Sequence, residues 1–350
     1  MVTYAASSDD AFALNDAVAG VIANAQLRGS ALVLRSVMGY KAASSASSQG
    51  LRAFESATKF LVGNMLRSIT KKLEVEILYG QVGIGVAASV TGAGPYVVTI
   101  SQAEWADGIW SGGEGMPLEW AATGLAGPVL GTGSITAIDL DARTLTVTLS
   151  TGIAPVATDV LFPKGAFGNE FAGIHKILTN TGSLFGISAA TYNLWKGNSY
   201  NASGALSFNK LQDAIALGVR KGLESDVKVF VNPLVWADLL NDQAALRSYD
   251  QSYSPSKAEN GAKSITFHGQ QGMIEIVPSI YVKIGYAYVL DIGCFAKVGS
   301  SDVTFKRPGK EGEFFLDLPS HHGYEIRVYC DMAVFCDKPG HQVLITGITT

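Results

Sequence analysis

The chain has 350 residues, a net charge of −4 and an isoelectric point near 5.8, which excludes a strongly basic nucleic-acid-binding protein. Hydrophobic residues make up 47% of the sequence, which excludes a disordered acidic chain. The charged fraction is only 16%, against a usual ~25%, whereas a folded monomer of this mass exposes about 13,500 Å². We infer that other chains cover much of this surface, as in a large obligate assembly.

Signals for export, membrane insertion and disulfide bonding are weak in this sequence. The first residues have neither a basic segment nor a long apolar segment, so we expect no signal peptide. No run approaches the ~18 apolar residues that a membrane-spanning helix needs, and we expect no contact with a membrane. The three cysteines are too few for a disulfide framework, and their odd number fits a reducing compartment.

An extended arm, a strand and a long helix are predicted at the start of the chain. Residues 1–30 have too few apolar side chains to fold alone, whereas residues 31–40 are predicted to form a strand. In residues 51–79 the apolar side chains recur at intervals of three, four or seven, which predicts one amphipathic helix. Such a helix is ~43 Å long. That length suits a strut across a flat subunit, and Gly80 ends it.

The next segment, residues 85–165, is rich in Gly, Thr and Val. This composition predicts a small β-domain or β-insertion with a partial core of its own. Strands are expected at 95–100, 134–140 and 144–149, and the last two are expected to form a hairpin through residues 141–143.

From residue 207 onward, predicted helices and strands alternate, which indicates an α/β arrangement. Ser207 is the expected N-cap of a helix, and Asn232 and Pro233 are expected to begin a second helix after a strand at 227–231. The polar stretch 248–263 is expected to be a mobile loop. Further strands are predicted at 264–268, 273–277, 287–291 and 324–330.

No pattern in the sequence identifies a catalytic, cofactor or metal site. Residues 83–88 fit a dinucleotide-binding pattern, but the helix precedes the glycines and the strand follows them, the reverse of what a pyrophosphate needs. Cys330 and Cys336 would lie ~20 Å apart in an extended strand, too far to share a zinc ion. The histidines considered with them are His321, His322 and His341. We therefore expect no cofactor, no metal and no enzymatic activity.

Four segments occur in an order that is typical of one protein family. Residues 53–80 end in Leu-Tyr-Gly, residues 182–198 contain two aromatic and glycine-rich stretches, and residues 229–236 join a strand to a helix. Residues 273–291 hold a later strand pair. In this order they resemble the spine helix, the entry into the axial domain and the axial-domain strands of the HK97-fold major capsid proteins of tailed bacteriophages. The resemblance covers roughly residues 30–340.

The resemblance implies an α+β, HK97-like capsid fold with five parts. These are an N-terminal arm and extended loop (1–50), a spine helix (51–80), a peripheral domain with a β-rich insertion (81–205), an α/β axial domain (206–306) and strands returning to the peripheral domain (307–350). The resemblance implies a structural protein that assembles as pentamers and hexamers into the icosahedral shell of the virion. The shell encloses packaged double-stranded DNA, which the protein contacts without sequence specificity. Assembly is expected in the host bacterial cytoplasm, with portal, scaffold and cement proteins as further partners.

Eight residues are candidates for contacts between subunits. Two of them are arginines that flank a short apolar stretch and are expected to pair with carboxylates of a neighbour. The full set is Arg28, Leu32, Leu34, Arg35, Arg67, Lys71, Tyr249 and Tyr253. In some family members an isopeptide bond crosslinks neighbouring subunits covalently, and its lysine lies in the extended loop. Residues 1–40 contain no lysine, so we expect a shell without covalent crosslinks.

The sequence leaves three other functions possible: two further kinds of self-assembling structural protein, and an enzyme. An encapsulin-like nanocompartment shell would share the fold and enclose a protein cargo. A phage tail tube protein would form open stacks of rings without pentamers. An enzyme would need a cluster of titratable side chains in a pocket.

Overall fold

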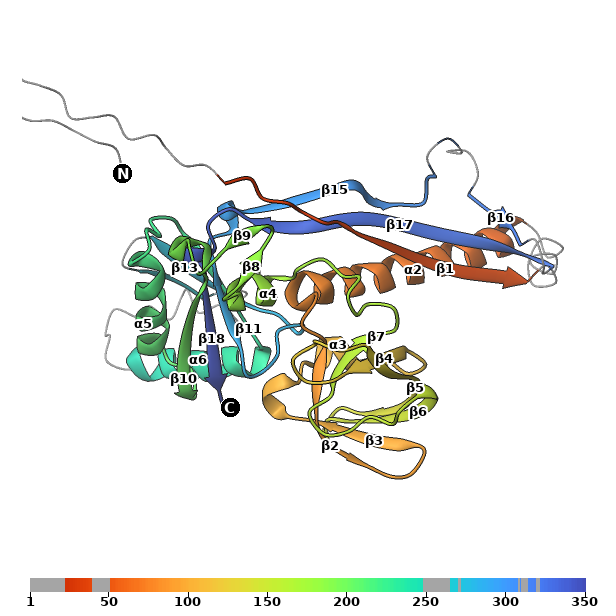
Figure 1. Ribbon diagram of the computed structural model, residues 1–350, viewed down its shortest axis with the longest axis horizontal. Helices are drawn as coiled ribbons and strands as arrows, with labels where there is room; N and C mark the ends of the chain where they lie inside the picture. Colours follow the sequence, from red (N-terminus) through yellow and green to blue (C-terminus); the bar gives the residue numbers. More distant parts are fainter. Residues whose placement is uncertain are drawn as a thin grey trace, which may run out of the picture.

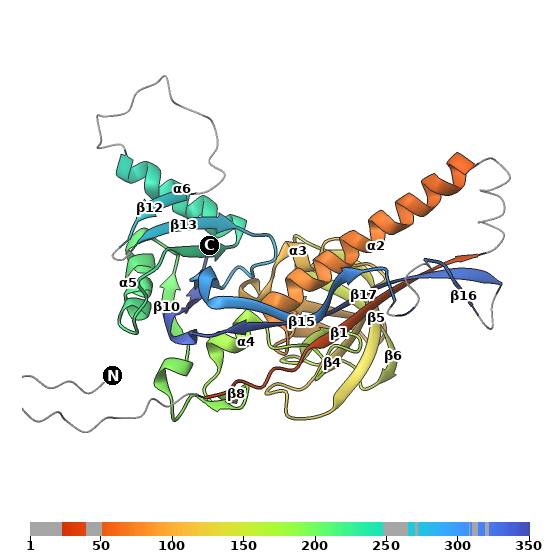
Figure 2. The same cartoon turned by 90° about the horizontal axis from the view of Figure 1, so that it is seen from above.

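The computed structural model describes residues 23–39, 51–247, 265–269, 272–307, 309, 314–318 and 322–350. It has three parts: a long sheet with a helix along it, a closed β-barrel, and a six-stranded sheet with helices (Figures 1 and 2). Residues 1–22 of the predicted arm at 1–30 lie outside the described residues, as does the whole predicted loop at 248–263. Among the described residues, no helix is long and apolar enough to cross a membrane.

The long sheet and its helix dominate the shape of the molecule (Figure 1). The strands β1 (Ser30–Gly39), β17 (Gly323–Cys336) and β15 (Phe295–Thr304) lie in that order, all antiparallel, and the short β16 (Leu316–Asp317) pairs with β17. The predicted helix is confirmed as α2 (Leu51–Tyr79). Its buried face, which includes Met65, Ile69 and Leu73, packs with Ile326 and Val328 of β17. The predicted strand at 31–40 is confirmed as β1.

The β-rich segment after α2 closes on itself as a barrel. Its strand order is β2–β3–β6–β5–β4–β7, and closure leaves no free edge. The predicted hairpin is confirmed by the antiparallel pair of β5 and β6. Trp105 and Trp110, from the segment between β3 and β4, stack with ring centroids 5.9 Å apart in the barrel core. The elements are β2 (Gly85–Thr91), β3 (Tyr96–Ile100), the 3-10 helix η1 (Gln102–Glu104), α3 (Asp107–Trp110), β4 (Pro117–Ala121), β5 (Val129–Asp139), β6 (Thr144–Gly152) and β7 (Val160–Pro163).

The third part is a six-stranded mixed sheet in the order β10–β18–β14–β11–β13–β12. Both predicted helix starts are confirmed: Oγ of Ser207 accepts a bond from the backbone N–H of Lys210, and Oδ1 of Asn232 accepts one from Leu234. The strands are β10 (Asn198–Gly204), β11 (Val227–Val231), β12 (Ile265–His268), β13 (Met273–Pro278), β14 (Ala287–Leu290) and β18 (Val343–Ile348). The helices are α5 (Phe208–Val219) and α6 (Pro233–Arg247).

Short elements connect the three parts. Between the barrel and β10 lie α4 (Ile174–Thr179), β8 (Ser183–Leu184), β9 (Ile187–Ser188) and the 3-10 helix η2 (Asn193–Trp195). Two further 3-10 helices, η4 (Ile292–Cys294) and η5 (Pro339–His341), lie where the chain passes between the two sheets. Through η4 the chain runs from β14 to β15, and through η5 it returns from β17 to β18.

Strand pairing differs from the predicted boundaries at both ends of the segment 206–306. The sequence predicts that residues 307–350 all return to the peripheral domain. In the structure β17 joins the long sheet, whereas β18 joins the six-stranded sheet. β15 also belongs to the long sheet, although it lies within 206–306, and β10 precedes that range but joins the six-stranded sheet. The reason is burial: Val343, Leu344 and Ile345 are all buried, which requires a central strand covered on both faces.

Candidate functional site

The outward-facing side chains of β1, on one face of the long sheet, are uncovered by the described part of the chain. Side chains on β1 alternate between half-buried and exposed, and the half-buried ones face α2. Val33 is 52% exposed and Val37 is 50% exposed, although both are apolar. Apolar side chains on an exposed edge strand are typical of a surface that another chain covers. We define the outer strip as Ala31, Val33, Arg35 and Val37 with their cross-strand partners Asp331, Tyr329, Arg327 and Glu325, of which Glu325 is buried.

The centre of the outer strip is rich in positive charge. Arg35 lies directly opposite Arg327 in the register of β1 and β17. Nε of Arg327 donates a hydrogen bond to Oε1 of Glu325 at 2.5 Å. This bond lowers the pKa of Glu325, and the charge of Arg35 adds to the effect. The guanidinium groups of Arg35 and Arg327 thus share the single carboxylate of Glu325. One positive charge stays unbalanced, and a carboxylate from another chain can pair with it.

The predicted contact residues of the N-terminal segment divide between two environments. Arg28 and Arg35 are exposed, as a role between subunits requires. Leu32 and Leu34 are half-buried and pack against the core between α2 and β17 of the same chain. Their contact with a neighbouring subunit stays a prediction, and their packing within the chain gives them a structural role as well.

The predicted contact residues of α2 also differ from each other. Arg67 is exposed. Lys71 is half-buried, and its Nζ donates a hydrogen bond to the backbone oxygen of Ser111 at 2.6 Å. This bond ties α2 to the barrel within one chain. Tyr249 and Tyr253 lie outside the described residues, so their role stays a prediction.

A cluster of polar side chains is buried where α2, the barrel and the six-stranded sheet meet. Nζ of Lys283, a residue that is 2% exposed, lies 2.7 Å from Oε2 of Glu104 and 4.4 Å from the centre of the Tyr79 ring. The hydroxyl of Tyr286 donates to the other oxygen of Glu104. We call this set the junction cluster: Tyr79, Glu104, His175, Lys283, Tyr286 and Tyr288.

Burial and charge fix the protonation states in the junction cluster. Burial would raise the pKa of Glu104, but the charge of Lys283 and the hydrogen bonds from Lys283 and Tyr286 hold it below its usual value. Burial, together with the charge of Lys283, lowers the pKa of His175 to about 4. His175 is therefore neutral at pH 7, and its Nδ1 lies 2.9 Å from the hydroxyl of Tyr288. A buried ion pair joined by hydrogen bonds fixes the orientation of the elements that carry it.

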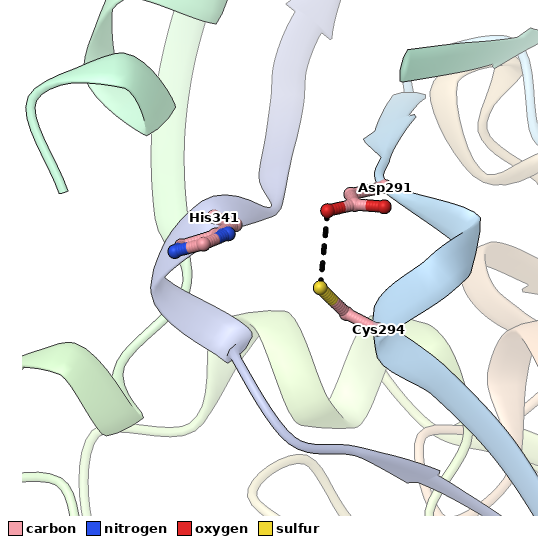
Figure 3. A group of neighbouring side chains, drawn as sticks. All are labelled: Asp291, Cys294 and His341. Carbon is pink, nitrogen blue, oxygen red and sulfur yellow. Dashed lines mark hydrogen bonds between the residues drawn. The ribbon is translucent and has the colours of Figure 1, made fainter. Parts of the chain in front are cut away.

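A second polar cluster lies at the paired crossings between the two sheets, and Figure 3 shows it. Its members are Asp291, Cys294 and His341, whose side-chain ligand atoms lie within 4.8 Å of one another. Sγ of Cys294 donates to Oδ2 of Asp291 at 3.1 Å. Burial and the nearby Asp291 carboxylate raise the pKa of the Cys294 thiol to about 12. The sequence analysis missed this cluster because it paired His341 with Cys330 and Cys336, whereas the fold brings His341 to Cys294.

The fold itself is found among solved structures. The capsid asymmetric unit of cyanophage A-1(L) matches with a TM-score of 0.54 and 11% identity, over 100% of this chain and 86% of that chain. The chain has a bacteriophage capsid fold. The procapsid of satellite phage P4 with the size determination protein and mycobacterium phage Patience match at lower TM-scores. These are 0.42 at 8% identity, over 99% of this chain and 80% of the other, and 0.37 at 9% identity, over 100% and 79%.

The comparisons of the whole sequence with protein families and curated proteins do not identify this fold. No protein-family model and no curated protein matches the sequence. The match to the cyanophage capsid covers the residues of all three parts: the long sheet, the barrel and the six-stranded sheet.

Proposed function

We propose that this protein is the major capsid protein of a tailed bacteriophage, which assembles as pentamers and hexamers into the icosahedral shell around packaged double-stranded DNA. The observation that carries the proposal is the capsid fold, which extends over the whole chain. The low charged fraction and the apolar, uncovered outer strip support it, because a shell subunit buries surface against several neighbours.

In this proposal each part of the chain has a structural role in the shell. Residues 1–50 are the arm and the extended loop, α2 is the spine helix, and the long sheet belongs to the peripheral domain. The barrel is the β-rich insertion. The six-stranded sheet with α5 and α6 is the axial domain, with β10 and β18 added to its expected range and β15 removed from it. Portal, scaffold and cement proteins are the further partners we propose, with assembly in the host cytoplasm.

We also propose that the shell is held without covalent crosslinks. Residues 1–40 contain no lysine that could form an isopeptide bond from the extended loop. Boiled particles should therefore run as single chains on a denaturing gel. A ladder of covalent oligomers would overturn this part of the proposal and leave the shell role intact.

Image reconstruction of the assembled particles, with analysis of their contents, tests the shell role. The proposal predicts closed particles with fivefold vertices and no stoichiometric protein cargo. A defined protein cargo inside closed particles would instead indicate an encapsulin-like compartment. Open tubes or stacked rings without vertices would indicate a tail tube protein.

A further inference from the structure

The cluster of Asp291, Cys294 and His341 has the composition of a metal site. A thiol, an imidazole and a carboxylate are the three ligand types that zinc takes in proteins. Ligand atoms at ~2.0–2.3 Å from a tetrahedral zinc ion lie about 3.3–3.6 Å from one another. The sulfur and the carboxylate oxygen are already 3.1 Å apart, and all three ligand atoms lie within 4.8 Å. Zinc binding therefore requires the longest of these separations to shorten by at most about 1.5 Å.

The imidazole of His341 provides an independent observation. Its Nδ1 is buried and has no hydrogen-bond partner among the described residues. A buried polar atom without a partner loses its hydration with no compensating bond, which is unfavourable unless a ligand supplies the interaction. In Figure 3 one ring nitrogen of His341 points toward the carboxylate of Asp291.

The surroundings of the carboxylate orient it as a ligand. Oγ of Ser225 donates to Oδ2 of Asp291 at 2.5 Å, and the backbone N–H of Gly293 donates to Oδ1 at 3.0 Å. The Cys294 thiol donates a third bond, to Oδ2. A carboxylate has about four lone-pair positions, and loss of the thiol proton on metal binding frees the position that this third bond takes, which leaves room for a cation. Bonds of this kind from outside the ligand set hold a metal-binding carboxylate in place.

We propose that Asp291, Cys294 and His341 bind a zinc ion, with a water molecule in the fourth position. On binding, the Cys294 thiol releases to solvent the proton that it shares with Asp291 and binds zinc as a thiolate. No electron is transferred and no other bond is broken. This inference rests on these side chains alone and does not depend on the shell role.

The position of the site gives the ion a structural task. Asp291 precedes η4 and Cys294 is its last residue, where the chain leaves the six-stranded sheet for the long sheet. His341 is the last residue of η5, where the chain returns. The two crossings already contact each other, because the backbone N–H of Asp337 donates to the oxygen of Cys294 at 3.1 Å. Zinc at this point clamps both connections and fixes the angle between the two sheets.

Cobalt binding tests the proposal, because Co²⁺ takes zinc sites and reports its ligands by absorption. The chain is freed of metal with a chelator and titrated with Co²⁺ alone. The proposal predicts one Co²⁺ per chain, tetrahedral ligand-field bands and a thiolate-to-cobalt charge-transfer band, all displaced by Zn²⁺. Zinc should also raise the thermal midpoint of the metal-free protein.

Three variants identify the ligands. His341→Ala should abolish the cobalt bands at the same Co²⁺ concentration, and Cys294→Ser should remove the charge-transfer band. Cys330→Ser, which changes a buried cysteine of β17 outside the cluster, is the matched control and should bind cobalt like the unchanged chain. Circular dichroism checks that each variant is folded. No cobalt band in the folded, unchanged chain, or bands that survive both ligand variants, would overturn the proposal.

Discussion

Arg35 of β1 lies directly opposite Arg327 of β17 on the uncovered face of the long sheet. Like charges in directly opposed positions destabilise a sheet. Glu325 accepts a hydrogen bond from Arg327 and balances one of the two charges. The second charge has no carboxylate opposite it on β17, so the outer strip is electrostatically complementary to a carboxylate of another chain. In the proposed shell, a neighbouring subunit supplies it.

Reversing the charge of Arg35 should separate folding from assembly. In Arg35→Glu the new carboxylate faces Arg327, so the free energy of unfolding of the monomer should stay unchanged or rise by about 0.2–1 kcal/mol. Assembly should fall strongly, because the strip then repels the carboxylate that it should bind. Urea denaturation measures the first effect and the yield of sedimenting particles measures the second. Arg35→Lys keeps the charge and should assemble; normal particle yield from Arg35→Glu would contradict this role.

The exposed valines of β1 should also act in assembly rather than in folding. Replacing Val33 and Val37 by Asn removes apolar surface that is already half-exposed in the single chain. Each valine should contribute about 1 kcal/mol when a neighbour covers it. The double variant should keep its thermal midpoint and require a higher protein concentration to assemble. The matched control, Val33→Ile with Val37→Ile, preserves the apolar strip, and equal critical concentrations for both double variants would show that the strip is not buried.

His175 should make the stability of the subunit depend on pH. Its pKa is about 4 in the folded chain and 6.5 in the unfolded one, so between these values only the unfolded chain binds the proton. The free energy of unfolding should therefore fall as pH decreases from 6.5 to 4, by at most about 3 kcal/mol. His175→Asn keeps a polar atom near Tyr288 and should remove this part of the dependence. Urea denaturation across the pH range measures the difference, and parallel curves for the two proteins would exclude His175 as its source.

The ion pair of Lys283 and Glu104 should be strongly coupled. In Lys283→Met the carboxylate of Glu104 stays in a largely buried position without its cation, which should cost about 3–5 kcal/mol of folding free energy. Adding Glu104→Gln removes that unpaired charge, so the double variant should be more stable than Lys283→Met alone. A double-mutant cycle by urea denaturation gives the coupling energy. Additive effects would mean that the two side chains do not stabilise each other.

Local sequence signals predicted the individual elements well. The apolar period of α2, the N-caps at Ser207 and Asn232, and the hairpin of β5 and β6 are all determined by neighbours in the chain. Such signals depend on one face of a helix or on one turn, so a single sequence contains them.

The pairing of distant strands was not predictable in the same way. β4 was missed because it begins with Pro117 and contains Glu119, an unusual residue for a buried strand. The carboxylate of Glu119 accepts hydrogen bonds from the backbone of Gly165 and Phe167, and only the closed barrel brings these groups together. The cluster of His341 with Cys294 was missed for the same reason, since it depends on how β14 and β18 pair. Contacts between residues far apart in the sequence leave no local period.

Negative-stain electron microscopy of the purified chain, taken directly after size-exclusion chromatography, tests the shell proposal most directly. The account predicts closed shells, or pentamers and hexamers that close into shells when the protein is concentrated. A chain that remains monomeric or dimeric at high concentration would contradict it, because the uncovered outer strip would then be a stable surface of the isolated protein.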